Sequence, residues 1–216
     1  MRTIINGEQG DDAWRTLRLG CATGSGFGFV LAKGKGSEEA VIRRNYRIRL
    51  ALELLTGVPE TNGFTTKDIQ TGIEREPAGR MALELATGLN IEQVSFIKLD
   101  DALIGCSPDG LIGEDAGFEV KCPSKAVHFE YLSLTDKPPT VYIPQVQGCM
   151  LVTGRSHWYF ASYNPDFPPE LQLHWIRVER DEPYIKALET ALVQFNAEVQ
   201  ETVATLQQMI NQKKAA

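Results

Sequence analysis

The sequence of 216 residues has few of the residue types that build zinc sites or histidine-based metal sites. It contains four cysteines and three histidines, and none of them shows CxxC, HxxxH or HExxH spacing. Zinc is usually held by such clusters, so a zinc centre is not expected. Metal chemistry in this chain would depend on carboxylates, which favour hard ions such as Mg²⁺ or Mn²⁺.

Long hydrophobic runs are also missing. No apolar stretch approaches the roughly 20 residues that cross a bilayer, and residues 1–10 have no apolar signal-peptide core. We therefore expect no membrane association, reduced cysteines and a cytoplasmic location. Hydrophobic residues make up 43% of the chain, which suits a single folded domain over residues 1–216.

The chain has no net positive charge. It contains 22 basic and 28 acidic residues, which give a net charge of −6. The balance changes along the chain. Residues 1–50 carry nine basic and five acidic residues, whereas the remainder carries 13 and 23. The basic end could face phosphate groups, or it could be a helix whose arginines point into solvent. The charge pattern alone leaves both interpretations open.

Hydrophobic spacing and turn residues predict a mixed α/β domain around a small sheet. The predicted helices cover residues 11–19, 37–56, 66–87 and 142–151, and the predicted strands cover residues 94–99, 104–107, 111–112, 117–121, 158–162 and 171–178. A long amphipathic helix, about residues 182–212, follows Asp181 and Pro183, which are typical of helix starts. This helix could pack on the core or contribute to an oligomer contact.

Three charged residues lie near one another in the strand-rich middle of the chain. Asp109 begins one short strand, and Glu119 and Lys121 lie two residues apart on the next. Because alternate residues of a strand share a face, a hairpin turn through residues 113–116 would place all three together. Two carboxylates can hold Mg²⁺ for phosphodiester hydrolysis, and a lysine can orient the attacking water or offset developing negative charge. The alternative is a surface hairpin with a Glu–Lys ion pair.

The segments around these residues, SPDGL at 107–111 and EVKCP at 119–123, resemble the phage lambda exonuclease family. This family, also described as YqaJ-like viral recombinases, is a branch of the PD-(D/E)xK nuclease superfamily. Further matching blocks follow in the same order over roughly residues 8–190, at 8–20, 53–57, 72–76, 142–147, 158–163 and 178–182. The resemblance implies a restriction-endonuclease-like α/β core, with a small mixed sheet flanked by helices.

The resemblance also implies a metal site. Asp109 and Glu119 would be metal ligands together with the backbone carbonyl of Val120, and Lys121 would be the catalytic lysine. The expected cofactor is Mg²⁺, in a site for two ions where Mn²⁺ can substitute.

Two further residues are implied to act at this metal site. Glu76 would reach in from a helix as an additional acid and ligand, and its glycine spacing favours it over Glu74. Gln147, the second glutamine of a Gln-x-Gln motif, would help to position metal-bound water or the lysine.

Three residues match family positions that hold a terminal 5′-phosphate: Arg18, Ser25 and Ser107. An arginine fork suits phosphate, and hydroxyl groups add donors. Without the resemblance, Arg18 would be assigned to an ion pair with Asp11 or Asp12, and the serines to helix caps. Lys35 stands where a family arginine reaches toward the DNA groove, so it is expected to bind DNA. Residues 124–140 match poorly, and no role is assigned to them.

The implied function is Mg²⁺-dependent 5′→3′ degradation of one strand of linear double-stranded DNA from a 5′-phosphorylated end. The family context implies a homotrimeric ring around DNA, a single-strand DNA annealing protein as partner, homologous recombination as the process, and a bacterial or phage-infected bacterial cell. Two alternatives remain: an endonuclease of the same superfamily, and a DNA-end-binding protein that has lost turnover.

Overall fold

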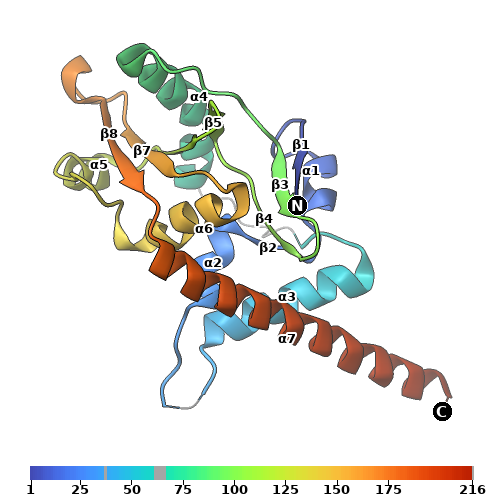
Figure 1. The fold of residues 1–216 in the computed structure, drawn as a ribbon. Helices are drawn as coiled ribbons and strands as arrows, with labels where there is room; N and C mark the ends of the chain where they lie inside the picture. The colour runs from blue at the N-terminus through green and yellow to red at the C-terminus, as the bar shows by residue number, and fades with distance from the viewer. Residues whose placement is uncertain (37, 61–66, 216) are drawn as a thin grey trace.

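The computed structural model describes residues 1–36, 38–60 and 67–215. Its strands form two mixed sheets, and helices pack around them (Figure 1). In the first sheet the strand order is β1-β3-β4-β2, with β1 (Arg2–Ile5), β2 (Ala22–Thr23), β3 (Phe96–Leu99) and β4 (Ile104–Cys106). In the second sheet it is β5-β6-β7-β8, with β5 (Gly110–Ile112), β6 (Ala116–Lys121), β7 (His157–Tyr163) and β8 (Leu173–Glu179).

The second sheet is built on the hairpin that the sequence predicts. Strands β5 and β6 pair antiparallel around a turn in which Gly113 has a φ of +49°, a conformation that glycine adopts at little cost. Strand β6 then pairs in parallel with β7, so that Glu119 lies beside Phe160 and Lys121 beside Ser162. A parallel pair needs a crossover connection, which the segment between β6 and β7 supplies.

The helices agree with the predicted ones, with somewhat different ends. They are α1 (Asp12–Leu17), α2 (Phe27–Val30), α3 (Val41–Thr56), α4 (Lys67–Thr87), α5 (Lys125–Tyr131), α6 (Ile143–Thr153) and α7 (Glu182–Ala215), with single 3₁₀ turns η1 (Gly24–Gly26), η2 (Thr140–Tyr142) and η3 (Pro169–Leu171). The predicted helix starts at residues 37 and 66 lie outside the described residues. Strand β1 and helix α5 were not predicted, and neither were β2 and α2, which lie in a glycine-rich segment. Strand β1 is largely exposed, pairs with β3, and is also held by Thr3, which donates to Asp100 Oδ1 at 2.6 Å.

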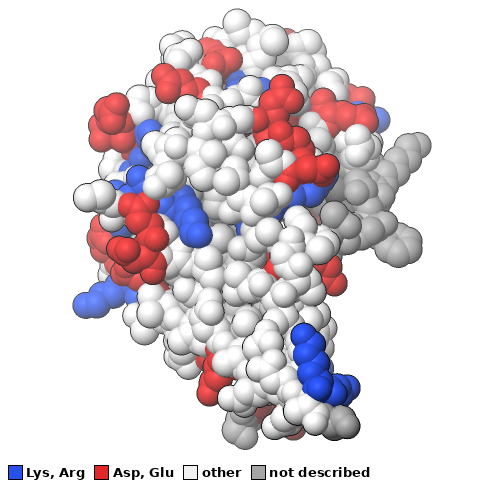
Figure 2. Space-filling view, turned by 90° about the vertical axis from the view of Figure 1, so that its right-hand side faces the viewer, with Lys and Arg blue, Asp and Glu red and all other residues white. Residues whose placement is uncertain are grey.

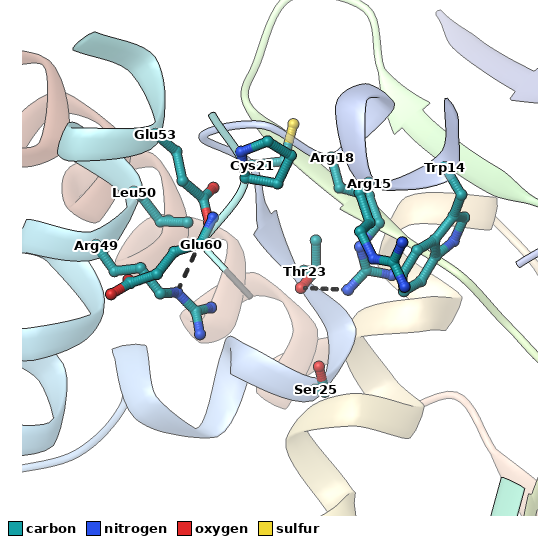
Figure 3. A pocket seen from close by; sticks show the side chains of 11 residues that line it. Trp14, Arg15, Arg18, Cys21, Thr23, Ser25, Arg49, Leu50, Glu53 and Glu60 are labelled. Atoms are coloured by element: carbon teal, nitrogen blue, oxygen red, sulfur yellow. Dashed lines mark hydrogen bonds and ion pairs between the residues drawn. The ribbon is translucent and has the colours of Figure 1, made fainter. Parts of the chain in front are cut away.

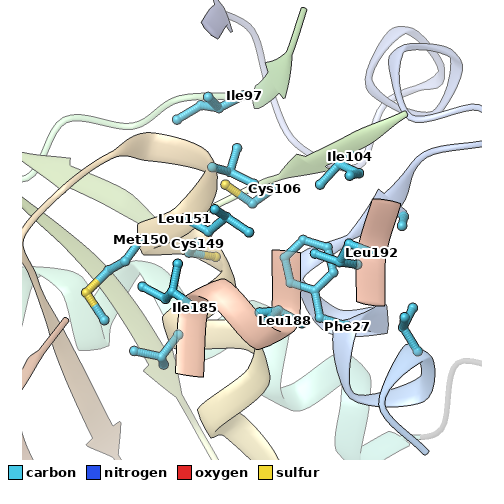
Figure 4. Packing of buried hydrophobic residues seen from close by; sticks show 14 of the residues in the cluster. Phe27, Ile97, Ile104, Cys106, Cys149, Met150, Leu151, Ile185, Leu188 and Leu192 are labelled. Atoms are coloured by element: carbon cyan, nitrogen blue, oxygen red, sulfur yellow. The ribbon is translucent and has the colours of Figure 1, made fainter. Parts of the chain in front are cut away.

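Helix α6 lies at the centre of the main hydrophobic core (Figure 4). Its residues from Val146 to Val152 are all buried, and Phe27 of α2 and Leu188 of α7 pack against it. Gly148 allows this approach, because a Cβ at that position would overlap the ring of Phe27. The core therefore fixes α6 relative to both sheets, and α6 carries the Gln-x-Gln motif.

Helix α7 packs on the core through its first half and runs beside α3 (Figure 1). Its fully buried side chains lie three or four residues apart: Ile185, Leu188, Leu192, Phe195 and Val199. Arg43 of α3 binds Glu198 of α7 at 2.7 Å. The core-packing interpretation is therefore confirmed for this half. The remainder extends past the body of the molecule, and its contribution to an oligomer stays a prediction.

Replacing Phe195 by alanine is expected to lower the free energy of unfolding by about 3–5 kcal/mol, because it removes a fully buried aromatic ring. That ring stacks on Tyr46 with centroids 5.5 Å apart. Chemical denaturation measures the loss. Val193→Ala on the same helix is the control, since Val193 is 57% exposed and should change stability by less than about 0.5 kcal/mol. Equal losses in the two variants would contradict the described packing of α7.

Candidate active site

The β5–β6 hairpin brings together the three charged residues singled out from the sequence. The backbone N–H of Val120 donates to Asp109 Oδ2 at 2.7 Å, and the ammonium group of Lys121 is ion-paired with Glu119 Oε1. Glu119 is only 2% exposed. A buried carboxylate of this kind is not the surface ion pair that the sequence left as an alternative.

Helix α4 adds Glu76 to this group. The helix lies close on β6, because a Cβ on Gly79 would come within 2.8 Å of Val120 Cγ2. Burial raises the pKa of Glu76 to about 6; Lys121 opposes this shift and Glu119 adds to it. Glu74 is exposed and accepts a hydrogen bond from Gln70 on its own helix at 2.8 Å. The geometry thus favours Glu76 over Glu74, as the glycine spacing does.

The group carries more negative charge than its one lysine balances. Burial and the charge of Glu119 raise the pKa of Asp109 well above its usual value. Burial also disfavours the charged form of Lys121, but Glu119 and Asp109 outweigh it and raise the pKa of Lys121. Glu119 Oε2 is buried and has no hydrogen-bond partner among the described residues. A cation beside that oxygen would satisfy it and relieve the repulsion between carboxylates.

These residues fit a magnesium ion. No three acidic, histidine or cysteine side chains in the described part of the chain converge closely enough to enclose an ion by themselves. Mg²⁺ commonly takes only one or two carboxylates and completes its shell with water and substrate phosphate oxygens. The unpartnered oxygen of Glu119 and the neighbouring Asp109 match that requirement. Glu76 and the carbonyl of Val120 remain predicted as further ligands.

The glutamine beside this group is Gln145, not Gln147. Gln145 Nε2 donates to Glu119 Oε1 at 2.6 Å. Gln147 is buried, donates to the carbonyl of Glu179 and accepts from the N–H of Asp181, both at 2.9 Å. The predicted position of Gln147 at the metal site is therefore wrong, because its amide joins α6 to the junction between β8 and α7.

Arg18 and Ser107 come together as the resemblance implied. Arg18 Nη1 donates to Ser107 Oγ at 2.9 Å, and the guanidinium stacks on Trp14 at 3.9 Å. The alternative partners of Arg18 are engaged elsewhere, since Asp12 pairs with Arg15 and Asp11 caps α1 by accepting from the N–H of Trp14. Arg18 is thus free of a carboxylate partner among the described residues.

A cavity of about 410 Å³ opens in front of Arg18 (Figure 3). Thr23 and the exposed Ser25 line it, and Arg49 lines it from helix α3. Ser107, which binds Arg18, lies only two residues before Asp109. Residues 107–109 thus lead along the chain from the partner of Arg18 to the carboxylate group.

Lys35 is not brought to this site. It is exposed in the segment between α2 and α3, where its carbonyl accepts from the N–H of Glu38 at 3.2 Å. In Figure 1 this segment forms a loop at the lower edge, away from β5 and β6. A role of Lys35 in DNA binding stays a prediction.

The basic excess of residues 1–50 is partly neutralised by ion pairs. Arg43 and Arg47 both bind Glu39, at 2.6 and 2.8 Å. On the face shown in Figure 2, basic side chains stand in separate groups among acidic ones. The basic residues therefore do not form one continuous positive surface for phosphate. Arg15, Arg18 and Arg49 line the cavity, and Arg15 is paired with Asp12 at 2.7 Å.

Four residues near the two sites were not singled out from the sequence. They are Gln145, Arg49, Tyr142, whose ring lies 5.0 Å from Lys121 Nζ, and Arg80, which donates to the carbonyl of Asp109 at 3.3 Å. For Arg80 a signal was present: it follows Glu76 by four residues, a spacing that places both on one face of a helix. The others depend on how distant helices pack.

The comparisons with known proteins agree with this geometry. A family model described as the YqaJ-like viral recombinase domain matches residues 13–156. The chain belongs to this family. The crystal structure of the alkaline exonuclease LHK-Exo from Laribacter hongkongensis is 33% identical, with a TM-score of 0.84 over 94% of this chain and 99% of that one. A complex of LHK-Exo with dAMP gives a TM-score of 0.85 at the same identity and coverage.

Two other proteins extend the comparison. ExoD of Escherichia coli (strain K12), described as uncharacterised, is 34% identical over 67 residues, which are 31% of this chain and 76% of ExoD. A phage related exonuclease from Haemophilus somnus 129PT shares the fold, with a TM-score of 0.67, 12% identity, and coverage of 86% and 96%. The protein is thus an exonuclease of the YqaJ and lambda exonuclease family, and the predicted nuclease fold is confirmed. Within the described ranges, no helix is long and apolar enough to cross a membrane.

Proposed function

We propose that this exonuclease degrades one strand of linear double-stranded DNA in the 5′→3′ direction, starting from a 5′-phosphorylated end and using Mg²⁺. The observation that carries the proposal is that Ser107, which binds Arg18 at the cavity, lies two residues from Asp109 of the carboxylate–lysine group. A cavity that holds the terminal phosphate beside a hydrolytic group would place the adjacent phosphodiester at that group. Binding of the end then selects the bond that is cleaved.

The chemistry follows from the side chains around the cleaved bond. Bound Mg²⁺ would supply charge neutralisation and acidify a coordinated water. Lys121 would orient the attacking water or stabilise negative charge as it develops on the phosphoryl oxygens. The N–H of Val120 holds Asp109, and Gln145 holds Glu119, so both carboxylates are oriented before substrate binds. Mn²⁺, which also takes oxygen ligands, is expected to substitute, and a site for two ions remains our expectation.

The same proposal includes a setting for the reaction. We infer a homotrimeric ring around DNA, a single-strand DNA annealing protein as partner, and homologous recombination in a bacterial or phage-infected cell, in the cytoplasm. The family description as a viral recombinase supports the process. The binding of dAMP by LHK-Exo supports a nucleoside monophosphate as product.

The decisive experiment uses linear 5′-phosphorylated duplex DNA labelled at either the 5′ or the 3′ end, with covalently closed circular duplex as control. We expect the 5′ label to be released first in Mg²⁺ and the circle to remain intact. Cleavage of the circle would support an endonuclease. Binding to DNA ends without cleavage in Mg²⁺ or Mn²⁺ would support an inactive end-binding protein.

The two glutamines of helix α6 are expected to have different effects when each is replaced by methionine. Gln145→Met removes a hydrogen bond to Glu119 and should lower kcat about tenfold or more, with little change in Tm. Gln147→Met leaves the N–H of Asp181 and the carbonyl of Glu179 unpaired. It should lower the free energy of unfolding by about 1–3 kcal/mol while kcat stays near that of the wild type. Kinetics and thermal unfolding of both variants test the assignment, and the reverse pattern would return the active-site role to Gln147.

A further inference from the structure

The cavity in front of Arg18 has a second cationic wall, formed by Arg49. Arg18 follows α1 and Arg49 projects from α3, so their guanidinium groups enter from opposite sides (Figure 3). Thr23 and Ser25 lie between them (Figure 3). Arg15 also lines the cavity but is paired with Asp12 at 2.7 Å, and Glu53 and Glu60 line it on the side of Arg49. Arg18 and Arg49 are thus the two cationic side chains that flank the hydroxyl donors.

The guanidinium of Arg49 is held in place but has donors to spare. It stacks over the ring of Tyr46 at 4.8 Å, and the hydroxyl of Tyr46 is itself fixed by the N–H of Thr23. Arg49 Nε is buried without a hydrogen-bond partner among the described residues. Its nearest carboxylate oxygen, Glu53 Oε1, is 4.0 Å away, which is too far for a hydrogen bond.

Glu53 does not fully balance Arg49, because its carboxylate serves other groups. Glu53 Oε2 accepts from the N–H of Gly20 at 2.9 Å, and Oε1 accepts from the N–H of Glu60 at 3.3 Å. On the opposite wall, Arg18 already donates to Ser107 and Thr23, which fix its orientation. Burial lowers the pKa of Arg18, and the charge of Arg49 adds to that effect. The two arginines therefore present like charges to the same cavity, and an anion between them would offset both.

We propose that Arg49 makes this cavity selective for a terminal phosphomonoester over a phosphodiester. A phosphomonoester carries about 1.5 to 2 negative charges at neutral pH, whereas a phosphodiester carries one. One arginine can bind either group, but two arginines facing each other favour the dianion. This inference rests on the proposed 5′-phosphate function of the cavity and deepens it. Arg49 distinguishes the terminal phosphomonoester of a strand from an internal phosphodiester. Arg18 distinguishes a 5′-phosphate end from a 5′-hydroxyl end.

Three duplex substrates that differ only at the 5′ end test this division. One carries a 5′-hydroxyl, one a 5′-phosphate, and one a 5′-O-methyl phosphate, which has the single charge of a diester. We expect the wild type to cleave the 5′-phosphate end about ten- to a hundredfold faster, by kcat/KM, than the methylated end. Arg49→Met should cleave the 5′-phosphate end and the methylated end at similar kcat/KM. It should still cleave the methylated end faster than the 5′-hydroxyl end. Arg18→Met should lose the preference for phosphate altogether.

Two further variants make the result specific. Arg44→Met changes an exposed arginine on the same helix and should match the wild type on all three ends. Arg49→Lys keeps the charge and should retain part of the ratio. If the methyl group merely clashed, the wild-type ratio would persist in Arg49→Met, and the inference would fail. If Arg49 served only as an ion-pair partner of Glu53, Arg49→Met would change Tm and leave the ratio intact, which would also overturn the inference.

These outcomes separate the inference from the proposed function. A wild-type enzyme that is indifferent to the 5′ group would refute the phosphate-binding role of the whole cavity. A wild type that prefers the phosphate, with Arg49→Met unchanged in its ratio, would refute only the role of Arg49. Should Arg49→Met fail to fold, the ratio in Arg49→Lys decides, because a role in selectivity predicts a partial loss and a structural role predicts none.

Discussion

Replacing Lys121 with methionine is expected to reduce strand cleavage roughly a hundred- to a thousandfold or more while the protein stays folded. Lys121 is ion-paired with the buried Glu119, and its ammonium group lies over the ring of Tyr142. Its charge offsets the charges of Glu119, Asp109 and Glu76, and methionine preserves most of its aliphatic stem. The loss should appear in kcat, measured by nucleotide release from linear duplex in Mg²⁺.

The matched control for Lys121 is Lys125→Met, four residues further along the chain. Lys125 is largely exposed and lies 3.7 Å from Asp166, so its variant should keep wild-type turnover. Asp109→Asn provides an independent probe, because an asparagine oxygen can still accept from the N–H of Val120. Its cleavage should be lost with a near-native Tm. Normal turnover in either active-site variant would remove that residue from the catalytic assignment.

The second large effect is expected for Arg18→Met, which should erase the preference for 5′-phosphorylated over 5′-hydroxyl ends. Arg18 has no carboxylate partner among the described residues and is oriented by Ser107 and by stacking on Trp14. Hydrogen bonds from a guanidinium to phosphate contribute about 1.5–3 kcal/mol, so a ten- to hundredfold preference should disappear. The ratio of kcat/KM values on the two ends measures this.

A change confined to the terminal phosphate distinguishes Arg18 from a general DNA contact. Arg177→Met, which removes an exposed cation paired with Glu179 on β8, should leave the ratio unchanged. Cleavage of 5′-hydroxyl ends by Arg18→Met should remain close to that of the wild type. A uniform decrease on both ends would instead assign Arg18 to stability or to general binding.

Features that depend on neighbouring residues could be predicted from the sequence. Strand alternation and a four-residue turn place Asp109, Glu119 and Lys121 together, because a hairpin is a local structure. The C-terminal helix begins at Glu182, since Asp181 caps it by accepting from the N–H of Tyr184. Arg18 and Ser107 are distant in sequence, and it was the family resemblance, not local geometry, that brought them into one prediction.

Features that depend on helix packing were decided by the tertiary structure. Gln145 and Gln147 are two residues apart on one helix, and only the rotation of α6 in the core determines which of them faces Glu119. Arg49 could have been one of several solvent-facing arginines on α3. It lines the cavity because α3 packs against α7 and lies beside the turn that carries Ser25. Side-chain periodicity shows which residues share a face, but packing determines what that face meets.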